Sequence, residues 1–320
     1  MGKRILITGV NGFIGTHLSR KLYDEGHYVV GVDWIRYNNW VSDQRWQYRK
    51  LHRYSQLSIE YSANLAKILS DEKIDIVMHL AAETGVLESF SHPQKYIETN
   101  ISGFLSVLQA MLASNVKNLI YASSSSVYGG FSGLGEDSEL SCPRSVYAVT
   151  KKTDELLAKV YSLQFGLNCV GLRFFTVYGE YGRRDMFPYI CANKILKEEE
   201  VPLRGDGFMQ RDFTYVGDVC EAISRIVKKE FPSNVIYNIG GGNPVSVQVF
   251  ANKLADKLGK QLKTKLVESS FKEDYRTSAD SSYFDVVYGK VDYTPLNAGL
   301  EKYAKWLLEN ESDCVNDIIS

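Results

Sequence analysis

Tyr147 and Lys151 are the two residues in this sequence whose types and spacing most clearly predict chemistry. If the stretch around them is helical, a spacing of four puts the phenol and the ammonium on one face. Free tyrosine has a pKa of about 10, so acting as a base at neutral pH needs about 4 kcal/mol of stabilisation of its charged form. A neighbouring ammonium supplies part of that stabilisation. Because the same spacing also describes an ordinary surface pair, the surrounding motifs must decide between the two interpretations.

A glycine-rich motif near the N-terminus predicts a nucleotide site that would complete this chemistry. Residues 8–15 read Thr-Gly-Val-Asn-Gly-Phe-Ile-Gly and lie between a β-rich run and a helical pattern. In that context glycines let backbone amides approach a pyrophosphate at the N-terminus of a helix. Asp33 ends the second β-rich run, where an acid bonds the adenosine ribose hydroxyls and repels a 2′-phosphate. The motif therefore favours NAD, whose cationic nicotinamide would further stabilise a tyrosinate, although Arg36 leaves NADP as an alternative.

Aromatic and basic side chains are interleaved between residues 34 and 54, with Arg45 and Arg49 among them. Such a mixture can stack on bases and contact the phosphates of single-stranded nucleic acid. Nucleic-acid binding would need a wider basic surface than one segment provides in a chain with a net charge of -1. We therefore interpret this segment as a loop packed beside the adenosine, and we predict no nucleic-acid partner.

Four motifs in register give this chain a resemblance to a known family. They are the glycine-rich motif at residues 8–15, His-Leu-Ala-Ala at 79–82, the serine cluster at 123–129 and Tyr-x-x-x-Lys at 147–151. With these motifs the chain resembles, nearly end to end, the extended short-chain dehydrogenase/reductase family of nucleotide-sugar enzymes. The segments at 172–179, 182–186 and 210–215 make it similar, more narrowly, to UDP-glucuronate 4-epimerases.

The resemblance implies which residues meet the cofactor and which act on the substrate. It places the following residues on NAD or along its path: Gly9, Asn11, Gly12, Phe13, Ile14, Gly15, Asp33, Leu80, Ala81, Ala82, Thr99, Tyr147 and Lys151. Ser124 falls at the family's catalytic serine or threonine position, where a hydroxyl bonds the substrate oxygen and shares its proton with Tyr147. The implied catalytic residues are therefore Ser124, Tyr147 and Lys151.

The serine cluster also discriminates between reactions within this family. Dehydratases carry an acidic pair at the positions of Ser125 and Ser126, and decarboxylases usually carry a glutamate at the second of these positions. This chain has only hydroxyls there, so the resemblance argues against elimination of water. Oxidation at C4 followed by reduction from the other face needs only Tyr147, Ser124 and NAD. Epimerisation is therefore the reaction that the resemblance favours.

For the substrate, the resemblance implies a diphosphate site and a sugar site. Arg211 and Arg276 would bind the diphosphate, a role for which a planar fork of donors is suited. Arg183, Thr176 and Ser125 would face the sugar, where a cation and hydroxyls suit the carboxylate of a uronate.

Two departures from the epimerase pattern leave a neutral or differently substituted hexose open as the substrate. Leu87 stands where an arginine is frequent, which removes one possible partner of a carboxylate. Glu83 stands where glutamine is usual, and its carboxylate would repel a uronate unless it is protonated or paired. Arg184, in place of a usual proline, would compensate for the missing cation.

The elements that must position these residues alternate along the chain. Short β-rich runs at residues 4–8, 28–33, 74–80, 118–122 and 168–174 are separated by helical patterns, among them 96–113 and 149–165. This rhythm indicates crossover units on a parallel sheet. We predict an α/β fold, a Rossmann-type doubly wound parallel sheet with a smaller, interleaved C-terminal substrate domain. The predicted NAD-binding domain spans 1–173, with 213–240 returning to it, and the substrate domain spans 174–212 and 241–320.

Composition is consistent with an enzyme that acts on small molecules. The chain has 320 residues, with 37 basic and 38 acidic side chains, so it presents no large field for nucleic acid or an anionic membrane. The five cysteines are scattered without a Cys-x-x-Cys motif, so we expect neither a disulfide framework nor a metal site. No apolar run suggests a signal peptide or a membrane span. We expect a soluble, cytoplasmic protein, and the resemblance implies a homodimer.

The resemblance therefore implies an NAD-dependent nucleotide-sugar 4-epimerase that converts UDP-glucuronate to UDP-galacturonate through a transient 4-keto intermediate. Two alternatives within the same family are a neutral UDP-hexose 4-epimerase and a UDP-glucuronate decarboxylase. An alternative of another class is a non-catalytic NAD-binding sensor. The intact set of Ser124, Tyr147 and Lys151 argues against a sensor, because a sensor needs the glycine-rich loop but no base.

Overall fold

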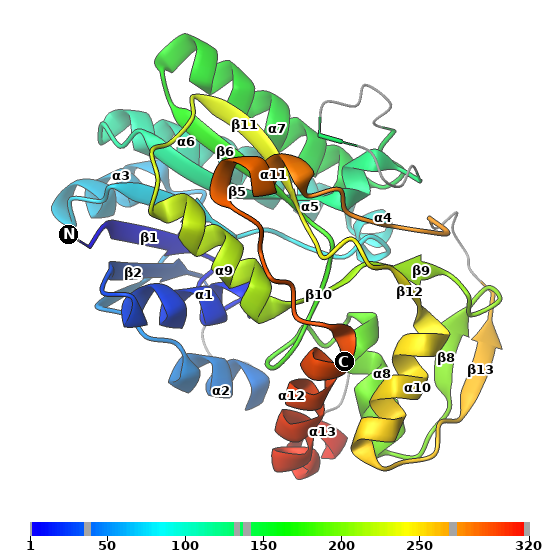
Figure 1. Ribbon diagram of the computed structural model, residues 1–320. Helices are drawn as coiled ribbons and strands as arrows, with labels where there is room; N and C mark the ends of the chain where they lie inside the picture. The colour runs from blue at the N-terminus through cyan, green and yellow to red at the C-terminus, as the bar shows by residue number, and fades with distance from the viewer. Residues whose placement is uncertain (1, 35–39, 131–134, 137–141, 269–273, 317–320) are drawn as a thin grey trace.

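Seven parallel strands form the central sheet of the computed structural model, which describes residues 2–34, 40–130, 135–136, 142–268 and 274–316 (Figure 1). Across the sheet the order is β11 (Asn234–Ile239), β6 (Asn168–Phe174), β5 (Asn118–Ser124), β4 (Ile76–His79), β1 (Arg4–Thr8), β2 (Tyr28–Asp33) and β3 (Arg53–Gln56). Every neighbouring pair runs parallel. Most of these strands are buried along nearly their whole length, which explains why they are apolar runs rather than alternating patterns.

Helices cover both faces of this sheet. One face packs against α1 (Phe13–Asp24), α9 (Val216–Val227) and α11 (Ser282–Tyr288), and the other packs against α3 (Ser62–Asp71), α6 (Gly103–Ala113) and α7 (Val146–Phe165). Side chains alternate between the two cores, since Ile5 and Ile7 join the first and Leu6 joins the second. The predicted Rossmann-type doubly wound fold is therefore confirmed.

The order of the strands places a crevice at the carboxyl ends of β1 and β4. The chain leaves β1 for β2 on one side, and later returns to place β4 on the other side. At such a switch point the two following loops diverge, and ligands of open α/β sheets bind between them. The loop after β1 carries the glycine-rich motif, and the loop after β4 begins at Leu80.

The helix predicted at residues 96–113 is helical in the structure but not uniform. α4 (Glu88–Ser91) and α5 (Pro93–Tyr96) lead into a π-helical stretch, η1 (Ile97–Ser102), and only then into α6. Inside η1 the buried Asn100 accepts a hydrogen bond from the backbone N–H of Glu83 at 2.8 Å and donates to Thr150 Oγ1 at 2.9 Å. These bonds to other segments are made from within the irregular turn. Such π-helical turns commonly occur beside functional sites.

The C-terminal part of the chain builds a second core from short elements (Figure 1). Its strands pair as β7 (Thr176–Tyr178) with β10 (Phe213–Tyr215), β8 (Val201–Arg204) with β13 (Thr264–Val267), and β9 (Gln210–Arg211) with β12 (Val245–Ser246). Its helices are α8 (Phe187–Leu196), α10 (Val247–Leu258), α12 (Leu296–Glu309) and α13 (Glu311–Asn316). In the sequence, α9 and β11 come between these segments, but in space they belong to the large sheet and its helical cover. The exact division into two domains remains a prediction.

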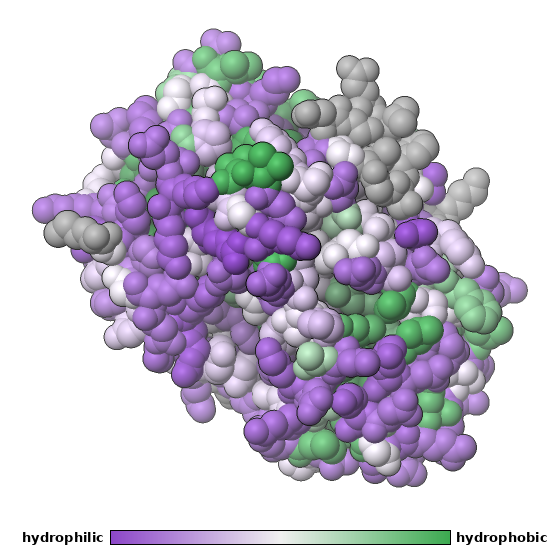
Figure 2. All heavy atoms as spheres, in the orientation of Figure 1, coloured by the Kyte–Doolittle hydropathy of each residue, from purple (hydrophilic) through white to green (hydrophobic). Residues whose placement is uncertain are grey.

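Hydrophilic side chains cover most of the face seen in Figure 2, and hydrophobic ones form separate patches, one of them over α11. Val286 of α11 is among the exposed apolar residues. Within the described residues, no helix has both the length and the apolar character needed to cross a membrane.

Candidate active site

A cavity of about 860 Å³ opens at the carboxyl ends of the strands, between the sheet and the C-terminal part. The predicted site residues that line it are Gly9, Gly12, Phe13, Ile14, Gly15, Leu80, Ala82, Ser124, Ser125, Tyr147, Lys151, Thr176, Arg183 and Arg211. The fold thus brings residues as far apart in the sequence as Gly9 and Arg211 to one cavity. The remaining predicted residues, Asn11, Asp33, Ala81, Thr99 and Arg276, are not among the lining residues.

The glycine-rich loop has the geometry that a pyrophosphate group requires. Gly9 has a φ of +68°, and a Cβ there would come within 2.7 Å of the Ala81 backbone nitrogen. A Cβ on Gly15 would overlap the Gly9 carbonyl oxygen. Gly12 caps α1 without a side-chain hydrogen bond, so the first N–H groups of the helix remain available to an anion at the cavity. The loop therefore fits the predicted dinucleotide.

Asp33 lies behind this loop rather than in the cavity wall. It is only 7% exposed, and its Oδ2 accepts a hydrogen bond of 2.9 Å from the backbone N–H of Asn11. The Asn11 side chain in turn donates to Tyr54 and accepts from Arg49. Asp33 thereby fixes the loop, while its bond to a ribose remains a prediction.

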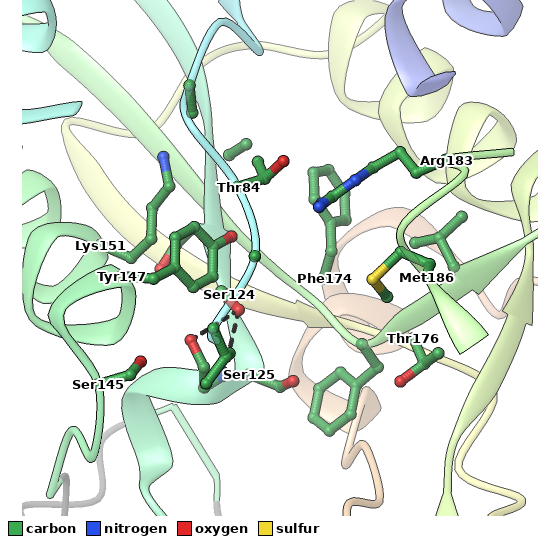
Figure 3. A pocket seen from close by; sticks show the side chains of 18 of the residues that line it. Thr84, Ser124, Ser125, Ser145, Tyr147, Lys151, Phe174, Thr176, Arg183 and Met186 are labelled. Atoms are coloured by element: carbon green, nitrogen blue, oxygen red, sulfur yellow. Dashed lines mark hydrogen bonds between the residues drawn. The ribbon is translucent and has the colours of Figure 1, made fainter. Parts of the chain in front are cut away.

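Tyr147 and Lys151 come from the first turns of α7, which begins at Val146, three residues before the predicted start. Ser145 is the N-cap, and its hydroxyl accepts a hydrogen bond of 3.0 Å from the backbone N–H of Ala148. Figure 3 shows the Tyr147 hydroxyl directed into the cavity, with Lys151 one turn along the same face. The predicted helical spacing of the pair is therefore confirmed.

The Lys151 ammonium rests on a carboxylate and not on the phenol. Its Nζ lies 3.2 Å from Asp154 Oδ2, and the side chains of Lys151 and Asp154 are 2% and 1% exposed. Burial raises the pKa of Asp154 to about 7. Burial, together with the charge of Lys151, lowers the pKa of His79 to about 3, so this neighbour is a neutral imidazole bonded to Thr8 Oγ1 at 2.8 Å. Sequence reasoning missed both Asp154 and this use of His79.

A buried ion pair holds α7 against the strands that carry the serine cluster. Arg173 of β6 donates to both oxygens of Glu155 on α7, at 2.7 and 2.9 Å. Ser123 of β5 donates to the same carboxylate at 2.7 Å. Burial opposes ionisation of Glu155, yet the bonds from Arg173 and Ser123 hold its pKa below the usual value. Ser123 therefore has a structural role, as a donor to the Glu155 carboxylate.

Ser124 ends β5 and caps the short helix η2 (Ser125–Tyr128). Its Oγ accepts hydrogen bonds from the backbone N–H of Ser126 at 3.2 Å and from the Ser126 hydroxyl at 2.9 Å. Because Ser124 accepts both bonds, its own hydroxyl proton can point toward the cavity that it lines. Ser125 also lines the cavity, whereas Ser126 bonds back to Ser124.

The wall opposite Tyr147 carries the predicted sugar residues. Figure 3 shows Arg183 extending into the cavity above Met186, with its end overlapping the Phe174 ring in this view and Thr176 below Met186. Arg183 donates through Nε to Asp185 Oδ1 at 3.1 Å and through Nη2 to Asp185 Oδ2. The cation expected for a uronate is therefore present, and it is paired with a carboxylate of its own chain.

The two predicted diphosphate ligands differ in their placement. Arg211 lines the cavity, and its Nη1 donates to the carbonyl of Asp274 at 2.7 Å and to that of Gln210 at 2.9 Å. Arg276 is exposed and pairs with Gln210 in an isolated β-bridge. Its neighbours Asp274 and Thr277 line the cavity, but Arg276 itself does not.

The structure also accounts for the two departures noted in the sequence. The Glu83 carboxylate is paired with Lys95 at 3.0 Å and is not among the lining residues. Leu87 joins Val86 and Phe90 in an apolar part of the wall. Neither placement was visible in the sequence, because both depend on how η1 and the loop after β4 pack together.

Comparison with known proteins gives the family of this chain. The NAD dependent epimerase/dehydratase family matches residues 5–240. Protein CapI of Staphylococcus aureus is 37% identical, over 96% of this chain and 98% of that protein. A UDP-glucuronate 4-epimerase of Thermodesulfobacterium geofontis is 34% identical, over 95% of this chain and 96% of that protein.

A solved structure extends this similarity to three dimensions. The crystal structure of UDP-glucuronic acid 4-epimerase from Bacillus cereus, in complex with UDP-glucuronic acid and NAD, superposes with a TM-score of 0.88. The identity is 31%, over 96% of this chain and 99% of that chain. The glycine-rich loop described above agrees with the cofactor of this family, which is NAD. The chain therefore belongs to the NAD dependent epimerase/dehydratase family and is an NAD-dependent nucleotide-sugar epimerase.

Proposed function

We propose that this enzyme epimerises C4 of UDP-glucuronate to give UDP-galacturonate. The observation that carries this proposal is the arrangement of two opposite walls in one cavity (Figure 3). Tyr147 and Ser124 lie on one wall as proton-handling hydroxyls, and Arg183 with Thr176 lies on the other. A hexuronate placed between them would direct its C4 hydroxyl to Tyr147 and its carboxylate to the guanidinium, a pairing for which arginine is suited.

The residues of this chain provide the acid–base part of the reaction. NAD, when bound at the glycine-rich loop, supplies the hydride acceptor and donor. Tyr147 would remove the proton of the C4 hydroxyl as the C4 hydride leaves, and would return it when the rotated keto sugar is reduced on its other face. Ser124 would donate a hydrogen bond to the same oxygen. Lys151, which lines the cavity one turn along α7, supplies positive charge near the tyrosinate. Because the cavity brings most of them together, we propose that the residues predicted above to contact the cofactor and the substrate do so.

Retention of the keto intermediate requires a firm hold on the diphosphate. Arg211 is the one of the two predicted diphosphate ligands that lines the cavity, so we propose it as a principal diphosphate ligand. Arg276, which is exposed beside β9, would join it only after a change of side-chain conformation on binding. A sugar that rotates while its diphosphate stays bound can receive hydride on either face.

A neutral UDP-hexose remains the second candidate substrate, because one observation favours it. Arg183 is already paired with Asp185, so the sugar pocket needs no substrate carboxylate to balance its charge. A uronate must compete with Asp185 for this guanidinium, whereas a hydroxymethyl group need not. Decarboxylation is less favoured, because Ser126 has no carboxylate and donates its hydroxyl to Ser124.

Proton NMR of the purified protein with NAD and UDP-glucuronate tests the proposal directly. New H1 and H4 signals of UDP-galacturonate would establish both the reaction and the sugar. UDP-glucose and UDP-N-acetylglucosamine serve as parallel substrates. If only a neutral sugar is epimerised, the uronate assignment is wrong, and released carbon dioxide would instead identify a decarboxylase.

We also propose that the enzyme is a homodimer that uses the outer face of α7. Val149, Leu156, Val160 and Leu163 are exposed apolar residues of this helix, and Leu163 is 71% exposed. Their spacings of 7, 11 and 14 from the first residue place them along one stripe, which a second copy of the chain would cover. Light scattering should show a dimer for the natural protein and a monomer for Leu163→Glu; a dimer in both would remove α7 as the interface.

A cytoplasmic location is the remaining part of the proposal. Cys169, Cys191 and Cys220 are buried thiols. Buried thiols of this kind are compatible with a reducing compartment. Fractionation of cells that produce the protein, with a thiol count of each fraction, would test this location.

A further inference from the structure

The strongest unexplained feature of the molecule is Arg45 on α2 (Trp40–Tyr48), a helix between β2 and β3. Its Nε and Nη2 donate to the carbonyl of Tyr181 at 3.0 and 2.8 Å, and Nη2 also donates to the carbonyl of Gly182 at 3.1 Å. Its Nη1 donates to the carbonyl of Asn11 at 3.5 Å. One guanidinium therefore joins the glycine-rich loop to the segment that precedes Arg183, and it also lines the cavity.

The segment held by Arg45 has an unusual backbone that other contacts support. Tyr181 has a φ of 56°, a conformation that costs free energy for a residue with a side chain. Its ring packs against His17, Tyr48 and Trp306, with ring centroids 5.7, 4.7 and 5.1 Å away. The neighbouring carbonyl of Glu180 is bonded to His17 Nε2 at 2.8 Å. This turn presents the two carbonyls to Arg45 and places Arg183 one residue beyond them.

The charge of Arg45 is balanced incompletely by its own neighbours. Its hydrogen bonds go to backbone carbonyls, and among the described residues no carboxylate lies within ion-pair distance of it. Burial and the positive charge of Arg183 lower its pKa to about 10. A partly buried cation held by carbonyl dipoles, with the carboxylates of Asp33 and Asp185 beyond ion-pair distance, gains from a nearby anion. The anion that this cavity receives beside the glycine-rich loop is the pyrophosphate of NAD.

We propose that Arg45 is a positioning residue that couples occupancy of the cofactor site to the sugar site. The pyrophosphate supplies the counter-charge for Arg45, and the ordered guanidinium then holds the carbonyls of Tyr181 and Gly182 so that Arg183 faces the sugar. The sugar side of this coupling rests on the function proposed above. Because coupling between two ligands is reciprocal, NAD and the nucleotide sugar must tighten each other by the same factor.

Binding measurements in a Tyr147→Phe background, in which turnover is blocked, test this coupling without relying on activity. Calorimetry gives the Kd of UDP-glucuronate with and without NAD, and the ratio of the two is the coupling factor. Where NAD copurifies with the protein, the fraction of NAD retained after dilution, with and without UDP-glucuronate, gives the reciprocal readout. We expect a factor of about 5–150 in the parent, the usual range for coupled sites.

Arg49 offers a matched control on the same helix. It donates to the side chain of Asn11 and stacks over Trp46 and Tyr54, at 3.5 and 4.3 Å from their ring centroids. Arg45→Met should reduce the coupling factor to near one, whereas Arg49→Met should weaken NAD binding but keep the factor. The proposal is overturned if the parent shows no coupling, if Arg45→Met keeps the full factor, or if Arg49→Met loses it equally.

Two further measurements keep the test independent of folding and of the choice of sugar. Arg45→Lys retains the positive charge but cannot bridge three carbonyls, so it should fold and still lose most of the coupling. If UDP-glucuronate does not bind the parent in the presence of NAD, the uronate assignment has failed. UDP-glucose then replaces UDP-glucuronate in the same measurements. The Arg45 proposal is then decided by the coupling factor between NAD and UDP-glucose.

Discussion

The two parts of this molecule that meet at the cavity are built in different ways. In the nucleotide-binding part, strands of four to seven residues form one continuous parallel sheet with helices on both faces. In the C-terminal part, strands of two to four residues pair across long separations, as β8 does with β13 and β9 does with β12. Local pattern is therefore sufficient to define the first part, whereas the second depends on contacts between distant segments.

The chemistry is divided along the same line. The nucleotide-binding part contributes backbone amides, hydroxyls and basic side chains such as Lys151 and Arg45, and buried bonds between Arg173 and Glu155 hold α7 in place. The C-terminal part contributes arginines whose partners are carboxylates and carbonyls of the chain itself, as for Arg183 and Arg211. We therefore expect substitutions in the first part to change catalysis and those in the second to change substrate binding and choice.

The largest effect should come from Tyr147→Phe in the nucleotide-binding part. Loss of a positioned acid–base group should lower kcat by about 10²–10⁴-fold. Affinity for NAD should stay within about a factor of two of the parent, because the glycine-rich loop is untouched. An NMR time course measures kcat, and a fluorescence titration measures the affinity for NAD. A variant that retains near-full turnover would remove Tyr147 from the mechanism.

The next largest effect should come from Arg211→Met in the C-terminal part. Losing charge-assisted hydrogen bonds worth about 1.5–3 kcal/mol should raise KM for the UDP-sugar by about 10–100-fold. NAD affinity should not change, which would sharpen the division between the two parts. Arg276→Met is the comparison, and its effect should be smaller because Arg276 is exposed outside the cavity wall. Equal effects would show that Arg276 enters the site when the substrate binds.

A smaller and more selective effect is expected at the sugar pocket. Arg183→Met should lower kcat/KM for UDP-glucuronate by about 10-fold, the loss of one ion pair, and leave UDP-glucose nearly unchanged. Asp185→Asn removes the internal competitor of Arg183, so it should shift preference toward the uronate. Competition assays with both sugars measure the ratio. If Arg183→Met lowers both rates equally, the guanidinium does not select the C5 substituent.

The smallest effect concerns stability and arises from the buried pair of Lys151 and Asp154. Burial raises the pKa of Asp154 to about 7, above its unfolded value. The corresponding stability is present below the unfolded pKa and is lost as pH rises through about 7. Relative to Asp154→Asn, the natural protein should therefore lose thermal stability between about pH 5 and about pH 8, where 1 kcal/mol corresponds to about 2–4 °C.

A matched exposed pair controls that measurement. Asp71 forms an ion pair with Lys67 on the surface of α3, with both side chains largely exposed. Asp71→Asn should leave the pH dependence of Tm as in the natural protein, because exposed pairs contribute little. Calorimetric scans at both pH values are sufficient. If Asp154→Asn and the natural protein respond to pH identically, Asp154 does not titrate in this range.

Much of the nucleotide-binding part was predictable because its signals are local. The strands at residues 4–8, 28–33 and 168–174 match the prediction to the residue, since buried parallel strands appear as unbroken apolar runs. α7 begins at Val146, three residues before the predicted start, because Ser145 caps it. The π-helical turn around Asn100 was missed, because its bonds to Glu83 and Thr150 join segments far apart in the chain.

By itself the sequence determined the fold class, the glycine-rich loop and the helical pairing of Tyr147 with Lys151, because each depends on spacing within a few turns of chain. Only the tertiary structure decided which partner each charge takes. It paired Lys151 with Asp154, Arg183 with Asp185 and Glu83 with Lys95, and it set Arg45 between two loops. Spacing alone allows the pair of Lys151 with Asp154 and that of Arg183 with Asp185, which are three and two residues apart, but it does not bury the first pair. That burial, and the contacts of Glu83 and Arg45 with distant segments, depend on how folding brings the segments together.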